Sequence, residues 1–275
     1  MSQSEKRNNN TRIIVIIVIV AVLLLCCCGA VSMAGIVKYV MNSDIDIEDT
    51  HGGGGGRFEA RREITERFAV SAPPRVVIEN GVGSITVVGT DGDEIVVHAV
   101  ARAWGATHAL AEAAAERIEV SVVMEGDDVL HIFAAIPEEK ARFKSPQVEI
   151  EVEVPYACEI DVTNKVGEIR VLEIAGSCSV ALDVGSIEVS YLEIEGDNHI
   201  RTRVGSVDVI LMEDCACYLD AEAGIGAIDC EANIGDMHSR RRGPGDLLQG
   251  VIGDDPDATL TLRTSTGSIL ILHDD

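Results

Sequence analysis

Five cysteines in the second half of the chain are the residues whose type best suits metal or redox chemistry. They are Cys158, Cys178, Cys215, Cys217 and Cys230. The Cys215-x-Cys217 spacing would suit a metal or redox pair, but no paired histidine lies nearby in the sequence. Strand alternation puts all five on an inward face, beside residues such as Ile160 and Leu182. We therefore expect small buried side chains, with no disulfide and no zinc site.

The histidines and the acidic turns give no stronger sign of a site. No HExxH motif or Cys/His cluster is formed by His51, His98, His108, His131, His199, His238 and His273. The acidic turns 91–94 and 254–257 could hold Ca²⁺, but they lack the spacing of an EF-hand and of calcium-binding solenoid repeats. Phosphate-loop, dinucleotide and nucleophile-elbow motifs are missing. The sequence predicts no catalytic, cofactor-binding or metal-binding residue and no cofactor.

Three carboxylates keep one enzymatic alternative open. Glu188, Asp208 and Asp229 are expected at outward strand positions, where they could line the groove of a glycan-active β-helix enzyme. Any acidic solenoid shows outward carboxylates, so the main expectation is a protein without catalysis.

A short Gly-polar-aliphatic phrase recurs about every twenty residues over much of the chain. It begins at Gly83, Gly167, Gly185, Gly205, Gly226, Gly245 and Gly267. Such a period is typical of stacked repeats, since one repeat cannot bury its apolar face alone. The fold class expected is all-β, a β-solenoid with one short inserted helix over 106–117. Strands are also expected over 75–79, 85–88, 95–100, 118–124, 129–135 and 148–154.

Aligning the repeats on their glycines places Ala181, Arg201, Glu222, Arg241 and Arg263 at one equivalent position. Equivalent positions in stacked strands lie about 4.8 Å apart. Arg201, Glu222 and Arg241 are therefore expected to form a ladder of alternating charge, unless the register slips between repeats.

The composition restricts the partners. The net charge is −24, and 47% of the residues are hydrophobic but only 3% aromatic. A surface this acidic repels phosphate backbones, so nucleic acid is not an expected partner. The aliphatic residues suit a narrow, regularly layered interior.

An apolar segment near the N-terminus predicts a membrane anchor. Residues 13–37 contain no charge, Asn or Gln, and they are long enough to span a bilayer. A cleaved signal peptide is the alternative, but its apolar part is usually shorter. The flanking charges put a tail (1–12) in the cytoplasm and an acidic domain (58–275) outside, joined by a Gly-rich linker (38–57). Cys26 to Cys28 fall inside the span, as small apolar residues rather than lipidation sites.

Together, the single span, the repeats, the inserted Ala/Glu-rich helix and the segment Val148–Pro155 resemble the putative adhesin family of bacterial β-repeat proteins. The resemblance implies a surface interaction role over residues 70–275 and carries over no catalytic residue. We expect a single-pass cell-envelope protein that acts as an adhesin or scaffold. Its partner would be an envelope protein, a glycan or a second copy. An envelope sensor or assembly factor is a further alternative, although the tail is too short for a signalling domain.

Overall fold

The computed structural model describes residues 45–50, 57–136, 146–232 and 234–274. The chain divides into two compact units, 1–37 and 38–275, and every described residue belongs to the second. The predicted span 13–37 lies outside the described residues. Among those described, no helix is long and apolar enough to cross a membrane.

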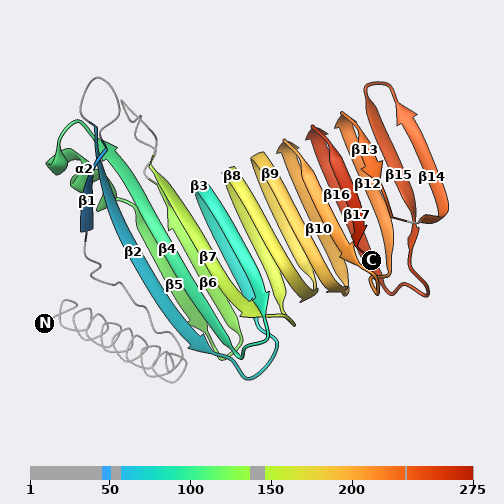
Figure 1. Ribbon diagram of the computed structural model, residues 1–275, viewed down its shortest axis with the longest axis horizontal. Helices are drawn as coiled ribbons and strands as arrows, with labels where there is room; N and C mark the ends of the chain where they lie inside the picture. Colours follow the sequence, from blue (N-terminus) through green and yellow to red (C-terminus); the bar gives the residue numbers. More distant parts are fainter. Residues whose placement is uncertain (1–44, 51–56, 137–145, 233, 275) are drawn as a thin grey trace, which may run out of the picture. The chain divides into compact units, whose positions relative to one another are not determined.

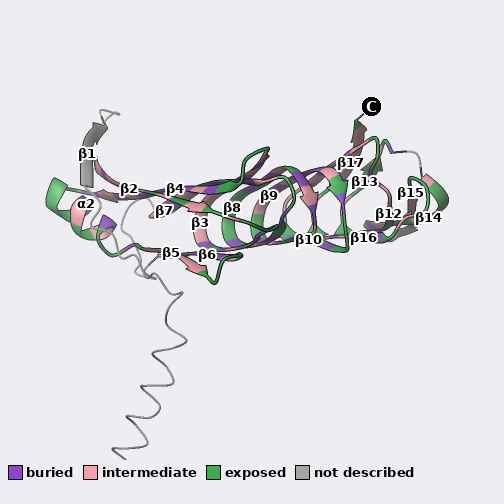
Figure 2. Ribbon diagram, turned by 90° about the horizontal axis from the view of Figure 1, so that it is seen from below, coloured by how far each residue is buried: buried purple, intermediate pink, exposed green. Residues whose placement is uncertain are grey.

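The strands of the second unit form two layers, which face each other across the core (Figures 1 and 2). Three strands run through both layers and bend between them: β3 (Arg75–Thr90), β8 (Glu159–Gly176) and β9 (Cys178–Ile194). The first layer also contains β5 (Glu119–Glu125), β6 (Val129–Ala135), β10 (Asp197–Val204), β12 (Cys217–Ile225), β14 (Ile234–Arg242), β15 (Gly245–Ile252) and β16 (Ala258–Thr266). The second also contains β1 (Ile45–Thr50), β2 (Arg57–Ala69), β4 (Glu94–Gly105), β7 (Gln147–Pro155), β11 (Val207–Met212), β13 (Ile228–Cys230) and β17 (Ile269–Asp274).

A glycine stands at each bend between the layers. A Cβ on Gly205 would lie 1.6 Å from the carbonyl oxygen of Gly185 in the neighbouring repeat, and the φ of Gly205 is +144°. Any side chain at this position would therefore clash with the backbone of the neighbouring repeat. It would also strain the backbone of its own residue, because this φ favours glycine. The same holds from repeat to repeat, in the spatial order Gly83, Gly167, Gly185, Gly205, Gly267 and Gly226. The recurring glycine thus fixes the parallel, in-register pairing of the repeats.

That spatial order differs from the order in the sequence. The last repeat, β16 with β17, lies between the β10–β11 repeat and the β12–β13 repeat. After β13 the chain forms the hairpin of β14 and β15, and β15 pairs with the edge of β12 that faces away from β10. The edge of β12 that faces β10 therefore stays available for β16. The turn at 253–257 then carries the chain back to the near edge of β12.

The phrase at Gly245 is not a bend, contrary to the expectation from the period. β14 and β15 form an antiparallel hairpin, in which Gly245 pairs with Arg242. The turn Gly243-Pro244 directly before it closes this hairpin instead of joining two layers.

The first part of the unit is irregular and largely antiparallel. β2 pairs with β4, and β4 with β7, which lies parallel to the second half of β3. The helix α2 (His108–Ala115) begins at Thr107, whose side chain accepts a hydrogen bond from the Leu110 amide. It buries Ala111 and Ala115. β1 falls within the segment expected as a linker and pairs with β2.

The core is aliphatic and follows the strand alternation. Inward positions carry Val, Ile, Leu, Ala and Cys, and the buried stretches run along the inner faces of both layers (Figure 2). The buried Asn198 joins three strands: its Oδ1 accepts from the Cys178 amide (2.8 Å), and its Nδ2 donates to the Thr259 carbonyl (3.2 Å). It also accepts from the Tyr191 hydroxyl at 3.0 Å.

The expectation of an all-β chain with one short inserted helix is confirmed over the described residues, and the sheet does not close on itself. The expected strands are present, and several are longer than the sequence indicated. β2 was not expected at all. It contains many charged residues, which hide the alternation of apolar and polar side chains, although Ala60 is buried in the core.

Candidate interaction surface

Four of the five cysteines are buried as expected, and all five are free thiols. Cys230 is half-buried, which corrects the expectation of five buried side chains. The reason is its position at the end of β13, which pairs on one edge with β17 and has no further strand partner among the described residues. Burial raises the pKa of Cys158 and of Cys217 to about 12. Thiols held in their protonated form are poor nucleophiles and poor metal ligands.

The histidines stand apart from one another. Nε2 of His98 lies 3.9 Å from Glu63, and Nε2 of His131 lies 3.4 Å from Glu125. Nδ1 of His238 lies 2.9 Å from a backbone carbonyl oxygen. Within the described ranges, no group of three or more His, Cys, Asp or Glu side chains could hold a metal ion. His51 lies outside those ranges.

The three candidate carboxylates share one outward column of the second layer. Asp208 stands beside Glu188, and Leu270 of the inserted repeat separates Asp208 from Asp229. Partial burial raises the pKa of Asp208. Two carboxylates, not three, are therefore neighbours.

The prediction that Arg201, Glu222 and Arg241 are successive neighbours in a charge ladder is wrong. The column itself exists, but Arg263 stands between Arg201 and Glu222 because β16 is inserted there. Leu247 of the antiparallel β15 follows Glu222, and Arg241 pairs with Asp246 in the hairpin.

Arg263 is the residue of this column that makes the ionic contacts. Its guanidinium donates to the Asp220 carboxylate, and its Nε lies 3.7 Å from Glu222. Burial disfavours ionised Asp220, but hydrogen bonds from Arg263 and Gln249 outweigh it and lower the pKa of this carboxyl.

A row of β-branched side chains, aliphatic except for one threonine, follows the bends, one residue before each glycine. We call it the corner row: Val82, Val166, Val184, Val204, Thr266 and Ile225, in spatial order. Val166, Val184, Val204 and Ile225 are between 40% and 54% exposed. Val166, Val184 and Val204 stand one strand spacing apart and form a continuous aliphatic run, and Thr266 separates Val204 from Ile225.

Beside the corner row lies a hollow of about 450 Å³, which we call the basic hollow. Ala181 lies in it between Thr163 and Arg201 on the neighbouring strands. The short alanine side chain leaves space that longer side chains would fill. The lining includes four cationic residues, Lys165, Arg201, Arg203 and Arg263, and one anionic residue, Asp183.

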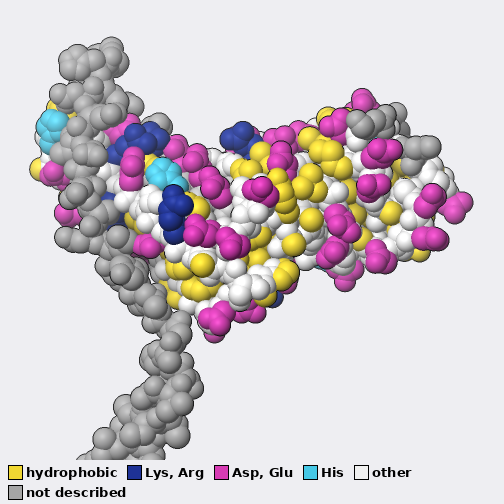
Figure 3. All heavy atoms as spheres, turned by 60° about the horizontal axis from the view of Figure 1, so that its bottom comes forward, with side chains coloured by type: hydrophobic (Ala, Val, Ile, Leu, Met, Phe, Trp, Pro, Cys, Tyr) yellow, Lys and Arg dark blue, Asp and Glu magenta, His cyan; other side chains and the backbone are white. Residues whose placement is uncertain are grey.

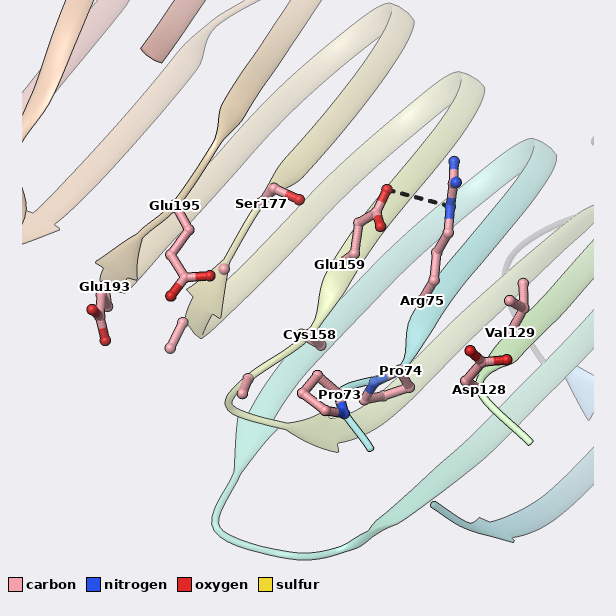
Figure 4. A pocket seen from close by; sticks show the side chains of 13 residues that line it. Pro73, Pro74, Arg75, Asp128, Val129, Cys158, Glu159, Ser177, Glu193 and Glu195 are labelled. Atoms are coloured by element: carbon pink, nitrogen blue, oxygen red, sulfur yellow. Dashed lines mark ion pairs between the residues drawn. The ribbon is translucent and has the colours of Figure 1, made fainter. Parts of the chain in front are cut away.

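A second hollow, of about 570 Å³, lies where β3 and β8 begin and β9 ends (Figure 4). Pro73, Pro74 and Asp128 line one part of it, and Glu193 and Glu195 another. Its single cation, Arg75, lies 3.4 Å from Glu159 and is thereby neutralised. This acidic hollow resembles the surrounding surface, over which Asp and Glu side chains are widely scattered (Figure 3).

No family model matches the chain, and no curated protein matches it either. Solved structures do. A protein of Clostridium sporogenes ATCC 15579, described as a "putative cell adhesion protein", superposes with a TM-score of 0.53 at 15% identity, over 77% of this chain and 100% of its own. A "putative adhesin" of Bacteroides fragilis NCTC 9343 covers 76% of this chain at 12% identity, with a TM-score of 0.24. At these identities the likeness concerns the fold, and it rests on the first of the two.

Proposed function

We propose that this chain is a cell-envelope adhesin or interaction scaffold of the putative adhesin family, without catalytic activity. In this proposal residues 13–37 anchor it in the membrane, with the N-terminus in the cytoplasm. The domain 58–275 stands outside as a β-solenoid and presents its bends to a partner.

The observation that carries the proposal is the corner row. A repeat needs its glycine to turn, but nothing in the turn requires a β-branched aliphatic residue in solvent directly before it. Lone exposed apolar residues are ordinary, whereas a contiguous row of them marks an interaction surface. Val166, Val184 and Val204 stand on three successive repeats and form such a row. The fold shared with a protein described as a "putative cell adhesion protein" supports this role.

A capture experiment tests the proposal. Immobilised chain is incubated with envelope extract, and a triple variant with Val166, Val184 and Val204 changed to threonine serves as the comparison. Threonine keeps the β-branched shape and removes the apolar contact, so folding is preserved. We expect the wild type to retain a saturable envelope component and the variant to retain much less. Equal retention by the two proteins would remove the corner row as the binding surface.

The adjacent carboxylates of Glu188 and Asp208 keep a glycan-active enzyme as the second candidate. Asp208, whose pKa is raised by partial burial, stands directly beside Glu188, and glycoside hydrolysis uses a pair of carboxyl groups. Release of reducing ends from envelope polysaccharide, abolished by Asp208→Asn, would favour the enzyme over the scaffold.

A further inference from the structure

The basic hollow is an exception on a chain whose net charge is −24. Most described arginines outside it have a carboxylate partner, as Arg102 has in Glu59 and Glu149. Two of the four cations of the hollow are likewise neutralised. Arg263 contacts Asp220 and Glu222, and Arg203 lies 3.7 Å from Asp183.

Arg201 and Lys165 differ. Neither has an ion pair or a side-chain hydrogen bond with any other described residue. Arg201 stands directly between Ala181 and Arg263, so that its neighbour on one side is a second arginine. Adjacent strands lie about 4.8 Å apart, so the two guanidinium groups repel each other unless an anion binds close to both.

The unpaired cations line a hollow that has room for a ligand. It lies over Ala181, with Arg201 on one neighbouring strand and Thr163 on the other, and Lys165 two residues further along the strand of Thr163. Its volume falls within the range of small-ligand sites. Arginine forks bind carboxylate and sulfate oxygens in pairs, and Thr163 and Ser265 offer hydroxyl groups nearby.

The carboxylates around the hollow favour a small anionic ligand over a large acidic one. An acidic protein would have to cover about 800 Å² and would meet the carboxylates around the hollow as well as its cations. A single anionic group within the hollow is affected mainly by the cations that touch it, since salt screens charges beyond about 8 Å. A sugar ring adds hydroxyl groups for the threonine and serine.

We infer that the basic hollow binds a carboxylate- or sulfate-bearing sugar unit of a glycan, with Arg201 and Lys165 as the residues that contact the anionic group. The inference rests on the proposed function, since it names the class of ligand for the surface beside the corner row. The corner row would then contact the less polar flank of the same chain of sugars.

Binding of glucuronate by the full-length chain in mild detergent tests the inference, measured by calorimetry at low salt. Glucose is the neutral control, sodium sulfate reports the anion alone, and a short poly-aspartate peptide reports the competing protein class. The variants are Arg201→Gln and Lys165→Gln. Arg170→Gln is the matched control, because Arg170 is an exposed arginine on the second-layer half of β8 and has a carboxylate 3.8 Å away.

We expect glucuronate to bind and glucose not to bind, with affinity at least tenfold lower in Arg201→Gln and unchanged in Arg170→Gln. Sulfate should compete with glucuronate. Equal losses in Arg201→Gln and Arg170→Gln, or equal binding of glucose, would overturn the inference. Binding of the peptide in place of glucuronate would overturn it in favour of a protein ligand.

The capture experiment with envelope extract separates this inference from the proposed function. If the wild type retains an envelope component but does not bind glucuronate, the scaffold stands and the hollow is not its glycan site. If neither occurs, both proposals fail.

Discussion

Two groups of repeats differ in how the chain orders them. In β3, β8, β9 and the β10–β11 repeat, spatial order follows sequence order. Beyond β10, the last repeat of the sequence lies inside the stack, between its two predecessors. Both groups use the same glycine bend, in which a Cβ added to the glycine would lie 2.0 Å or less from a backbone carbonyl oxygen of the neighbouring strand. The repeat therefore specifies how two neighbours fit, and the loops decide which repeats become neighbours.

The largest effect should come from removing the last repeat, residues 258–275. Loss of the final repeat from a sequentially ordered stack only shortens it. In this chain, deletion of the last repeat leaves β10 and β12 each without the strand that pairs with both of them. It thereby separates β12–β15 from the rest of the domain. We expect the cooperative thermal transition to be lost and amide protection in residues 217–252 to disappear, as measured by circular dichroism and hydrogen exchange. A melting temperature within a few degrees of the wild type would contradict the inserted order.

Glycine-to-alanine changes at the bends should come next. Gly205→Ala and Gly267→Ala each drive a Cβ into a neighbouring carbonyl and require a φ near +145°. We expect each to lower the free energy of unfolding by about 3 kcal/mol or more. Gly81→Ala, with open space around its Cβ, is the control and should change little. Urea denaturation measures all three. A mild effect at Gly267 alone would show that its contact with Gly205 is absent.

The buried thiols should give a smaller, pH-dependent effect. Cys158 and Cys217 ionise near pH 9 when unfolded, whereas burial raises the folded pKa of each to about 12. Above pH 9 the folded state binds more protons than the unfolded state, so that the free energy of unfolding falls as the pH rises, while below pH 8 these thiols add no slope. We expect a loss of about 1 kcal/mol per thiol by pH 10. The double variant Cys158→Ala, Cys217→Ala should show a flatter pH profile between pH 9 and 10. An unchanged slope would mean that the thiols are accessible.

The smallest effect concerns the two arginines that the insertion brings together. Arg263→Gln removes contacts to Asp220 and Glu222, and it should lower stability by a few tenths to about 1 kcal/mol. Arg201→Gln removes only a like-charged neighbour, so that stability should stay equal or rise slightly at low salt. Thermal melts at low and high salt measure both, and the difference should shrink as salt rises. A fall of the same size for both variants would show that Arg201 has a carboxylate partner.

The sequence predicted most of the strands, the helix and the alignment of the repeats on their glycines except at Gly245, because alternation and glycine spacing are local properties. It could not predict the order of the repeats, since several of them offer nearly equivalent edges to one another. The error in the charge ladder follows directly: Arg201 and Glu222 belong to one column, but Arg263, far along the chain, separates them.

One further signal was present but unused. Three residues before the glycine, Asn80, Asn164 and Thr264 point inward, and each donates a hydrogen bond to a backbone carbonyl near a bend, at 3.0, 2.8 and 3.2 Å respectively. A polar residue at a position that alternation assigns to the core indicates such a contact. The hollow over Ala181 could not be found this way, because its neighbours are set by the stacking and not by the period.

The inserted order of the repeats is the central claim, and engineered disulfides test it most directly. His199 and Thr261 face outward on adjacent strands, and Asp220 stands one strand beyond Thr261 in the same row. Cysteines one strand apart lie about 5 Å from each other at Cα, within the range of a disulfide, whereas two strands separate them by about 10 Å, which is too far. We predict that the His199→Cys, Thr261→Cys variant oxidises to an intramolecular disulfide, seen as a mobility shift in non-reducing electrophoresis, and that His199→Cys, Asp220→Cys does not. A disulfide in the second variant and none in the first would contradict the account.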